Sequence, residues 1–116
     1  MKQVNLSEKL TQFSAYWSPK IVAGYNGNDV MVVKVLGEFT WHSHPDTDDF
    51  FMVLKGEIDI EMRDRTVTLK EGEMFVVPKG VEHRPVARIE AHLMLIEPSG
   101  TPNTGDPDTA AAKDRI

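Results

Sequence analysis

Three histidines and one aspartate of this 116-residue chain are of the types and spacing that can hold a metal ion. His42 and His44 stand two residues apart, so on an extended chain both imidazoles leave the same face. Imidazole nitrogen commonly binds zinc, iron, copper or nickel. A carboxylate follows at Asp48 or Asp49. This set predicts a mixed nitrogen and oxygen site for a divalent transition metal, although a His-x-His pair alone is a weak signal.

A second stretch contains the third histidine. It begins at Gly72, and its short apolar run leads into a turn at Pro78 and Gly80, with His83 three residues after that glycine. Together the two stretches resemble the paired motifs of the cupin superfamily, G-x5-HxH-x3,4-E-x6-G and G-x5-P-x-G-x2-H-x3-N. The matching positions are Gly37, His42, His44 and Gly56 in the first motif and Gly72, Pro78, Gly80 and His83 in the second.

The chain departs from the family pattern at two positions. Asp49 replaces the glutamate of the first motif, and Ala87 replaces the asparagine of the second. Asp48 is the alternative ligand, but it would leave seven rather than six residues before Gly56, so Asp49 is preferred. The resemblance implies that the metal ligands are His42, His44, Asp49 and His83. It does not distinguish Fe, Mn, Ni and Zn.

Composition limits the classes of protein that fit the chain. A length of 116 residues with 41% hydrophobic and 27% charged residues is typical of one globular domain. A net charge of −5 without any basic patch argues against a nucleic-acid partner. The absence of cysteine excludes disulfides and thiolate ligands. We see neither an apolar run long enough to cross a membrane nor an apolar signal core, so a cytoplasmic location is the default expectation.

The pattern of apolar residues and turns predicts an all-β fold. Asn5 to Phe13 reads as a short helix that Ser18-Pro19 ends. Short apolar runs separated by glycine turns follow, which is typical of an antiparallel sandwich or barrel. We expect a helical segment at 1–18, a barrel at 19–97, and an extended, partly loose tail at 98–116. The resemblance implies a small jelly roll. The predicted strands are 21–24, 30–36, 50–54, 57–62, 67–69, 74–77, 81–86 and 91–96.

The strand at 30–36 has apolar residues on both faces. Such a strand is expected to be covered twice, once by the core and once by a second sheet or subunit. This pattern indicates a homodimer. The residues concerned are Met31, Val33 and Val35 on one face and Val30, Val32 and Leu36 on the other.

Two further residues are candidates for a substrate pocket. Strand parity puts Phe51 on the same side as Asp49, which would give the metal an apolar neighbour. His92 lies among apolar residues of the last strand, either lining the pocket or paired with a backbone group. We identify no arginine or lysine that would face the cavity to hold a phosphate or a carboxylate.

The resemblance implies several functions. Three imidazoles and one carboxylate leave coordination positions for water or a small organic molecule. The family contains dioxygenases, isomerases and decarboxylases, and also sugar-binding domains. We therefore expect a small-molecule ligand and a metalloenzyme of dioxygenase or isomerase type. The alternative is a non-catalytic domain that binds or senses a sugar-like molecule. A purely structural metal is disfavoured, because structural zinc sites are usually rich in cysteine.

Overall fold

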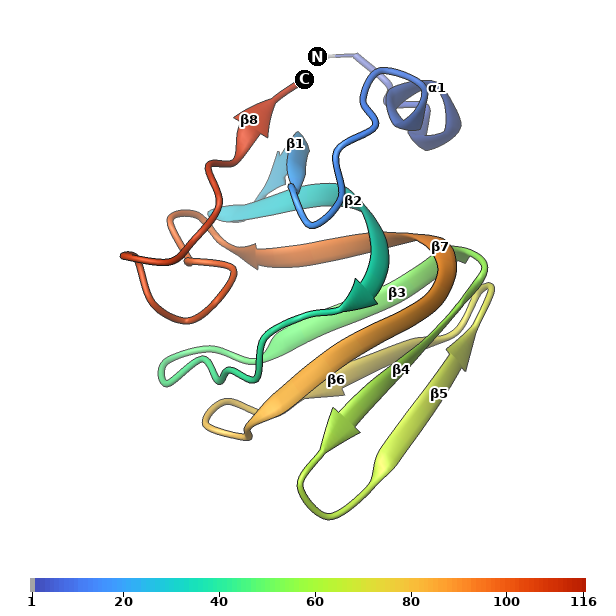
Figure 1. Ribbon diagram of the computed structural model, residues 1–116. Helices are drawn as coiled ribbons and strands as arrows, with labels where there is room; N and C mark the ends of the chain where they lie inside the picture. Colours follow the sequence, from blue (N-terminus) through green and yellow to red (C-terminus); the bar gives the residue numbers. More distant parts are fainter. Residues whose placement is uncertain (1) are drawn as a thin grey trace.

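A computed structural model describes residues 2–116 (Figure 1). One short helix precedes a sheet of eight strands, which confirms the all-β fold. None of the helices in this described part is long and apolar enough to cross a membrane. The elements are α1 (Leu6–Leu10), β1 (Lys20–Tyr25), β2 (Asn28–Glu38), β3 (Asp49–Lys55), β4 (Glu57–Met62), β5 (Thr66–Lys70), β6 (Met74–Val77), β7 (His83–Pro98) and β8 (Asp114–Arg115).

The N-terminal helix is shorter than the sequence predicts. Asn5 caps it, since its Oδ1 accepts a hydrogen bond from the Glu8 N–H at 3.0 Å. The helix closes at Thr11, whose N–H bonds to the Glu8 carbonyl three residues back. The extended chain that follows lies against β2, where both nitrogens of Trp17 donate to backbone carbonyls, at Lys34 and Leu36.

Strand β7 organises the sheet. One of its edges pairs with β2, while the other pairs first with β4 and then with β3. The sequence predicts two strands here, 81–86 and 91–96, but the structure joins them. β2 remains paired with both parts through a register shift between Val35 and Gly37, so the backbone of β7 bends without ending. The sheet is not closed by hydrogen bonds, because its order runs β5-β4-β7-β2-β1-β8.

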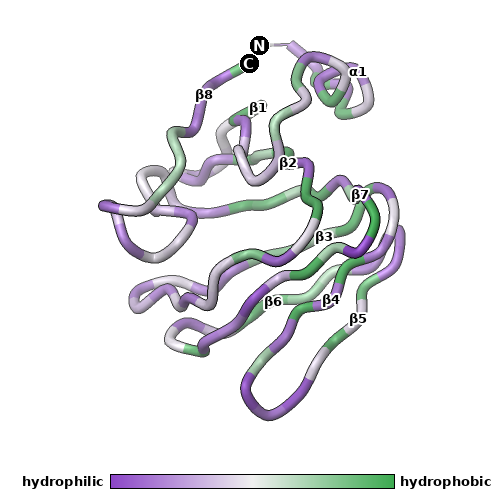
Figure 2. The backbone as a smooth tube through the Cα atoms, viewed as in Figure 1, coloured by the Kyte–Doolittle hydropathy of each residue, from purple (hydrophilic) through white to green (hydrophobic). Residues whose placement is uncertain are grey.

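The core lies between the inward faces of β2, β3, β4 and β7, where Figure 2 shows apolar stretches. Met31, Val33 and Val35 belong to this core as expected. On the other face of β2, Val32 is also fully buried within the single chain. The N-terminal segment crosses that face, and the Lys34 ammonium donates to the Phe13 carbonyl at 2.7 Å. The double apolar pattern therefore does not require a second subunit, and the homodimer remains a prediction.

Residues 98–116, here called the C-terminal strap, return to the sheet. They were expected to be extended and partly loose, but β8 pairs in parallel with β1, and the Ile116 N–H bonds to the Ile21 carbonyl at 3.0 Å. The strap also passes very close to the His-x-His segment. A Cβ atom at Gly105 would lie 2.0 Å from the Ser43 carbonyl oxygen, so only glycine fits this crossing. Composition does not reveal these contacts, because most of them are made by the backbone.

Candidate metal centre

Backbone hydrogen bonds bring the two histidine-bearing segments together. The N–H of His42 donates to the carbonyl of His83 at 3.0 Å, and the N–H of His83 donates to the carbonyl of His42 at 2.9 Å. A third bond joins the Gly80 N–H to the His44 carbonyl at 2.8 Å. The two motifs are thus paired directly, although they lie far apart in the sequence.

The side chains of His42, His44, Asp49 and His83 converge on one point. Each offers one ligand atom, and these four atoms lie within 4.8 Å of one another. The Nε2 atoms lie 3.8, 3.1 and 2.8 Å from the Asp49 Oδ2 for His42, His44 and His83, respectively. All four residues are buried. The structure therefore brings together the four residues proposed as ligands from the sequence.

Asp48, the alternative carboxylate, lies outside this cluster. Its Oδ1 accepts a hydrogen bond from the Lys79 N–H at 2.9 Å, and the residue is exposed. Asp49 instead begins β3 on the inward face and pairs with Val77 of β6. Strand parity thus separates the two adjacent aspartates, one into the core and one onto a turn.

Backbone carbonyls orient two of the imidazoles. The Nδ1 of His42 lies 3.0 Å from the Thr40 carbonyl oxygen, and the Nδ1 of His83 lies 2.9 Å from the Val81 oxygen. A carbonyl oxygen only accepts hydrogen bonds, so each Nδ1 carries a proton. The Nε2 atom of each ring is left to face Asp49, and such outer contacts are those that fix the rings of metal-binding histidines.

His44 provides the strongest indication that the cluster suits a metal ion. Within residues 2–116, its Nε2 is a buried polar atom without a hydrogen-bond partner. It lies 3.1 Å from the Asp49 Oδ2, yet the two atoms form no hydrogen bond. A buried nitrogen without a hydrogen bond is costly. A cation among the four ligand atoms would remove that cost, and imidazole with carboxylate is a donor set that divalent transition metals accept.

The buried charges perturb one another strongly. Burial alone would raise the pKa of Asp49, but contact with three imidazoles holds the pKa of this carboxyl far below its usual range. Burial alone would lower the pKa of His44, but the Asp49 carboxylate outweighs it and raises that pKa. Burial and the charge of Asp49 also raise the pKa of Glu97. The region is therefore a compact set of interacting charges in the interior.

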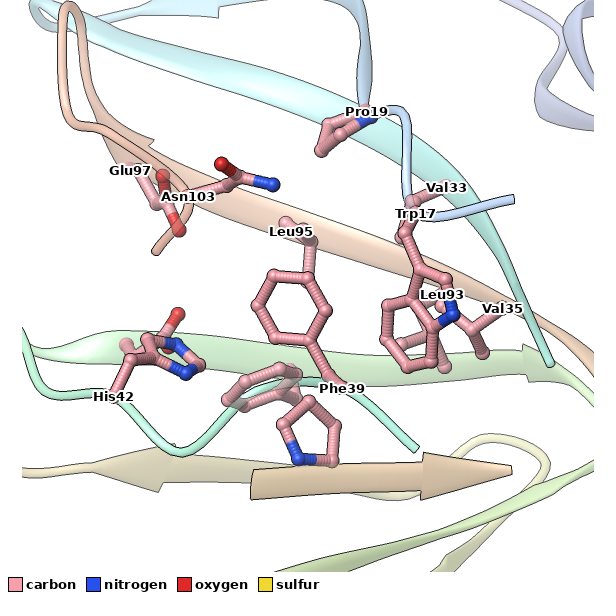
Figure 3. Close-up of a pocket in the computed structure, with 13 residues that line it drawn as sticks. Trp17, Pro19, Val33, Val35, Phe39, His42, Leu93, Leu95, Glu97 and Asn103 are labelled. Atoms are coloured by element: carbon pink, nitrogen blue, oxygen red, sulfur yellow. The ribbon is translucent and has the colours of Figure 1, made fainter. Parts of the chain in front are cut away.

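A cavity of about 40 Å³ lies beside the cluster (Figure 3). That is room for roughly three water molecules. Most of its wall is apolar, and Trp17 and Phe39 stack there with ring centroids 4.8 Å apart. Phe51 lies in the wall with its ring 5.8 Å from that of His83, on the side that strand parity predicts. The polar lining residues are His42, Asp49, Glu97 and Asn103.

His92, the other pocket candidate, does not line this cavity. The β7 residues that line it are Pro85, Leu93, Leu95 and Glu97, so His92 faces the opposite side of the strand. Its Nε2 lies 2.8 Å from the Glu90 Oε2, a side-chain partner rather than a backbone one. His92 therefore lies away from the cavity beside the metal cluster.

Three residues near the cavity were not singled out from the sequence. Glu97 continues the inward alternation of Leu93 and Leu95, so parity could have identified it. Asn103 and Lys113 belong to the C-terminal strap, and the sequence contains no local signal that places them at the cavity. Trp17, from the segment after the N-terminal helix, also forms part of the wall.

An all-β fold that gathers three imidazoles and a carboxylate beside a small cavity has the architecture of a cupin. The chain belongs to this family, since the profile described as "Cupin domain" matches residues 29–98. It is similar to a crystal structure of a cupin-2 domain containing protein from Shewanella frigidimarina. Identity is 47% and the TM-score 0.81, over 82% of this chain and 93% of that one.

Two curated relatives are also similar to this chain. The uncharacterized protein YdbB of Bacillus subtilis is 34% identical over 77 residues, which cover 66% of this chain and 68% of the relative. The 3-hydroxyanthranilate 3,4-dioxygenase of Meyerozyma guilliermondii is 29% identical over 75 residues, or 61% of this chain. The match spans only 44% of that dioxygenase, less than half its length.

Proposed function

We propose that this cupin is a metalloenzyme that acts on a small organic molecule, by dioxygenase or isomerase chemistry. His42, His44, Asp49 and His83 would hold a divalent transition metal: Fe, Mn, Ni or Zn. The observation that carries the proposal is the buried Nε2 of His44, which has no hydrogen-bond partner among residues 2–116. The similarity to a dioxygenase over part of its length supports it. When bound, such a metal supplies Lewis-acid chemistry and coordination positions for a substrate.

The residues around the metal centre have separate roles in this proposal. The carbonyls of Thr40 and Val81 hold two of the rings so that Nε2 faces inward. Asp49 contributes the negative charge that offsets a bound cation. The apolar wall keeps water away from the ligand and restricts its orientation, as Phe51 does beside His83.

The second candidate is a non-catalytic domain that binds or senses a small, sugar-like molecule. It is favoured by the scarcity of acid and base groups at the cavity. Apart from the metal cluster, the polar lining residues within the described part of the chain are Glu97 and Asn103. The Glu97 carboxylate is already paired with Lys113. Such a site could hold a ligand without transforming it.

Metal analysis and an activity screen together test the proposal. We expect the purified protein to retain about one metal ion per chain, because buried ligands bind metals tightly. Oxygen uptake by the iron-loaded protein would then be followed with catechol-like and keto-acid substrates. Absence of metal after growth in supplemented medium would contradict both candidates. Bound metal without turnover, with iron, manganese, nickel or zinc, would favour the binding domain.

A homodimer in the cytoplasm completes the proposal. Apolar side chains exposed on β6, Met74 and Val76, offer one surface for a second copy. Sedimentation velocity would show whether the chain pairs in solution.

A further inference from the structure

The cavity beside the metal centre is too small for the organic substrate of the proposed function. Its volume of about 40 Å³ holds only roughly three water molecules. Substrate binding therefore requires one wall of the cavity to move. Most of the wall is fixed, because it is built from paired strands and from the stacked rings of Trp17 and Phe39. Asn103, by contrast, belongs to the C-terminal strap (Figure 3).

The middle of the strap, residues 100–112 and here called the strap loop, is held to the sheet only through its two ends. Before it, the Ser99 N–H donates to the Gly27 carbonyl at 3.0 Å. After it, Lys113 pairs with Glu97 at 3.0 Å, and β8 pairs with β1. In the described chain, every hydrogen bond of the strap loop itself stays within the strap.

The strap loop also buries little apolar surface. None of residues 100–112 is buried, and their apolar side chains are those of proline and alanine. A segment with few buried contacts and no hydrogen bonds to its surroundings opens at a lower free-energy cost than the sheet does. The strap loop is therefore the part of the cavity wall that can move.

The strap loop nevertheless lies against the metal centre. A Cβ atom at Gly105 would collide with the carbonyl oxygen of Ser43, which stands between two of the metal ligands. Figure 1 shows the strap passing the same end of the sheet as the connection between β2 and β3. An open groove lies between the strap and the segment that carries His44. Lifting the strap loop would join this groove to the cavity and uncover the metal ligands.

We propose that the strap loop is a lid, which opens to admit metal and ligand and then closes over the metal centre, and that the ion pair between Lys113 and Glu97 is its latch. The Lys113 ammonium joins both ends of the loop, since it donates to the Glu97 carboxylate on β7 and to the Thr101 carbonyl. The closed lid keeps bulk water from the metal centre. This role rests on the proposed metal site.

Zinc alone can probe the lid, because it binds imidazole and carboxylate and has no redox chemistry. A lid that does not touch the metal changes how fast zinc enters and leaves, whereas a distorted metal site changes how tightly zinc binds. Competition with a fluorescent chelator gives the Kd, and a large excess of chelator gives the rate of release. The rate of entry is the ratio of the release rate to the Kd.

Gly105→Ala should hold the lid open. Its Cβ atom would collide with Ser43, whose neighbours His42 and His44 are fixed by backbone hydrogen bonds, so the strap loop should give way. We expect zinc release and zinc entry both to become faster by roughly 10- to 100-fold, which corresponds to the cost of an overpacked contact. The Kd for zinc should stay close to that of wild type.

Gly100→Ala is the matched control. Gly100 and Gly105 both have positive φ, +88° and +77°, so alanine strains the backbone of the strap in both variants. A Cβ atom at Gly100 would meet nothing within 4 Å beyond its chain neighbours. Gly100→Ala should therefore leave both rates close to those of wild type.

Lys113→Met removes the latch, and it decides the matter if Gly105→Ala does not fold. Zinc release and zinc entry should again rise together. Hydrogen exchange gives a second readout that needs no metal. The N–H groups of Gly105 and Ala111 bond only within the strap, so they should exchange faster in Lys113→Met, while those of β2 and β7 should not.

The outcomes separate the lid from the proposed function. If wild type binds no zinc, the metal site is wrong and the lid fails with it. If zinc binds but neither Gly105→Ala nor Lys113→Met changes the rates, the lid is wrong and the metal site stands. The same holds if release becomes faster only in proportion to a weaker Kd. Unchanged hydrogen exchange of the strap in Lys113→Met would show that the ion pair is not the latch.

Discussion

His83 and Arg84 are adjacent on β7, yet they belong to two charge clusters with opposite properties. His83 faces inward and joins Asp49 in the buried metal centre, where its Nε2 lies 2.8 Å from the carboxylate. Arg84 faces outward, with its guanidinium 2.7 Å from the Glu61 carboxylate and 3.0 Å from that of Glu38. Its guanidinium carbon also lies 5.3 Å from the centre of the Trp41 ring.

The difference between the clusters lies in whether their groups satisfy one another. In the outer cluster every carboxylate meets a guanidinium that is always charged, so nothing further is needed. In the inner cluster three rings share a single carboxylate oxygen, and the Nε2 of His44 has no hydrogen-bond partner in the described chain. Burial combined with incomplete pairing, rather than the number of charged groups, indicates a ligand site.

The largest expected effect comes from two histidines of the same strand. His83→Ala removes a buried ligand, and metal affinity should fall by more than the roughly 10- to 100-fold that is typical of losing an outer-shell partner. The purified variant should therefore contain almost no metal. His92→Ala is the matched control, because His92 lies on the other face and contacts Glu90. Its metal content, measured by elemental analysis, should equal that of wild type. Equal metal loss in both variants would contradict the placement of the site.

We expect a smaller effect on metal release from a substitution at Asp49, and none from one at the adjacent Asp48. Asp49→Asn keeps the shape of the side chain but removes the charge that faces three imidazoles, so metal should dissociate more readily in a competition with a chelator. Asp48→Asn removes charge from a turn that bonds Lys79. It should leave the metal off-rate unchanged. Faster release from Asp48→Asn alone would show that Asp48 is the ligand.

The residues of the metal centre could be predicted from the sequence, because the spacing of residues within each motif is a local signal. Two motif spacings placed His42, His44 and His83, and counting residues to Gly56 favoured Asp49 over Asp48. The all-β fold followed from alternation and turns in the same way. Such patterns report which face of a strand a residue occupies, and this depends only on neighbours in the chain.

Contacts between distant segments were not predictable in this way. The fusion of two predicted strands into β7 depends on continuous pairing with β2. The docking of the strap depends on backbone contacts at Gly105 and on the ion pair between Lys113 and Glu97. This segment has few apolar side chains, and backbone hydrogen bonds together with one buried charge pair hold it to the sheet.

The smallest expected effect is on the pH dependence of stability. In metal-free protein, the pKa of His44 is raised. Its contribution to folding stability is therefore complete below about pH 6.5 and is lost as pH rises through the raised pKa. The pKa of Asp49 is lowered, so its contribution to folding stability is present above about pH 4 and is lost only in acid. The Tm of metal-free protein should therefore fall from about pH 5.5 to about pH 8.

The outer cluster and the bound metal should each affect the dependence of Tm on pH in a different way. Arg84 stays charged across this range, and its pKa is raised further by the hydrogen bond to Glu61. Arg84→Met should thus lower Tm slightly and equally at both pH values, as expected for an exposed ion pair. Metal loading should reverse the slope, because metal-binding imidazoles must be deprotonated and affinity grows with pH. Differential scanning calorimetry can compare the metal-free protein, Arg84→Met and the metal-loaded protein. If the Tm of the metal-free protein rises with pH, the pKa shifts assigned to the inner cluster are wrong.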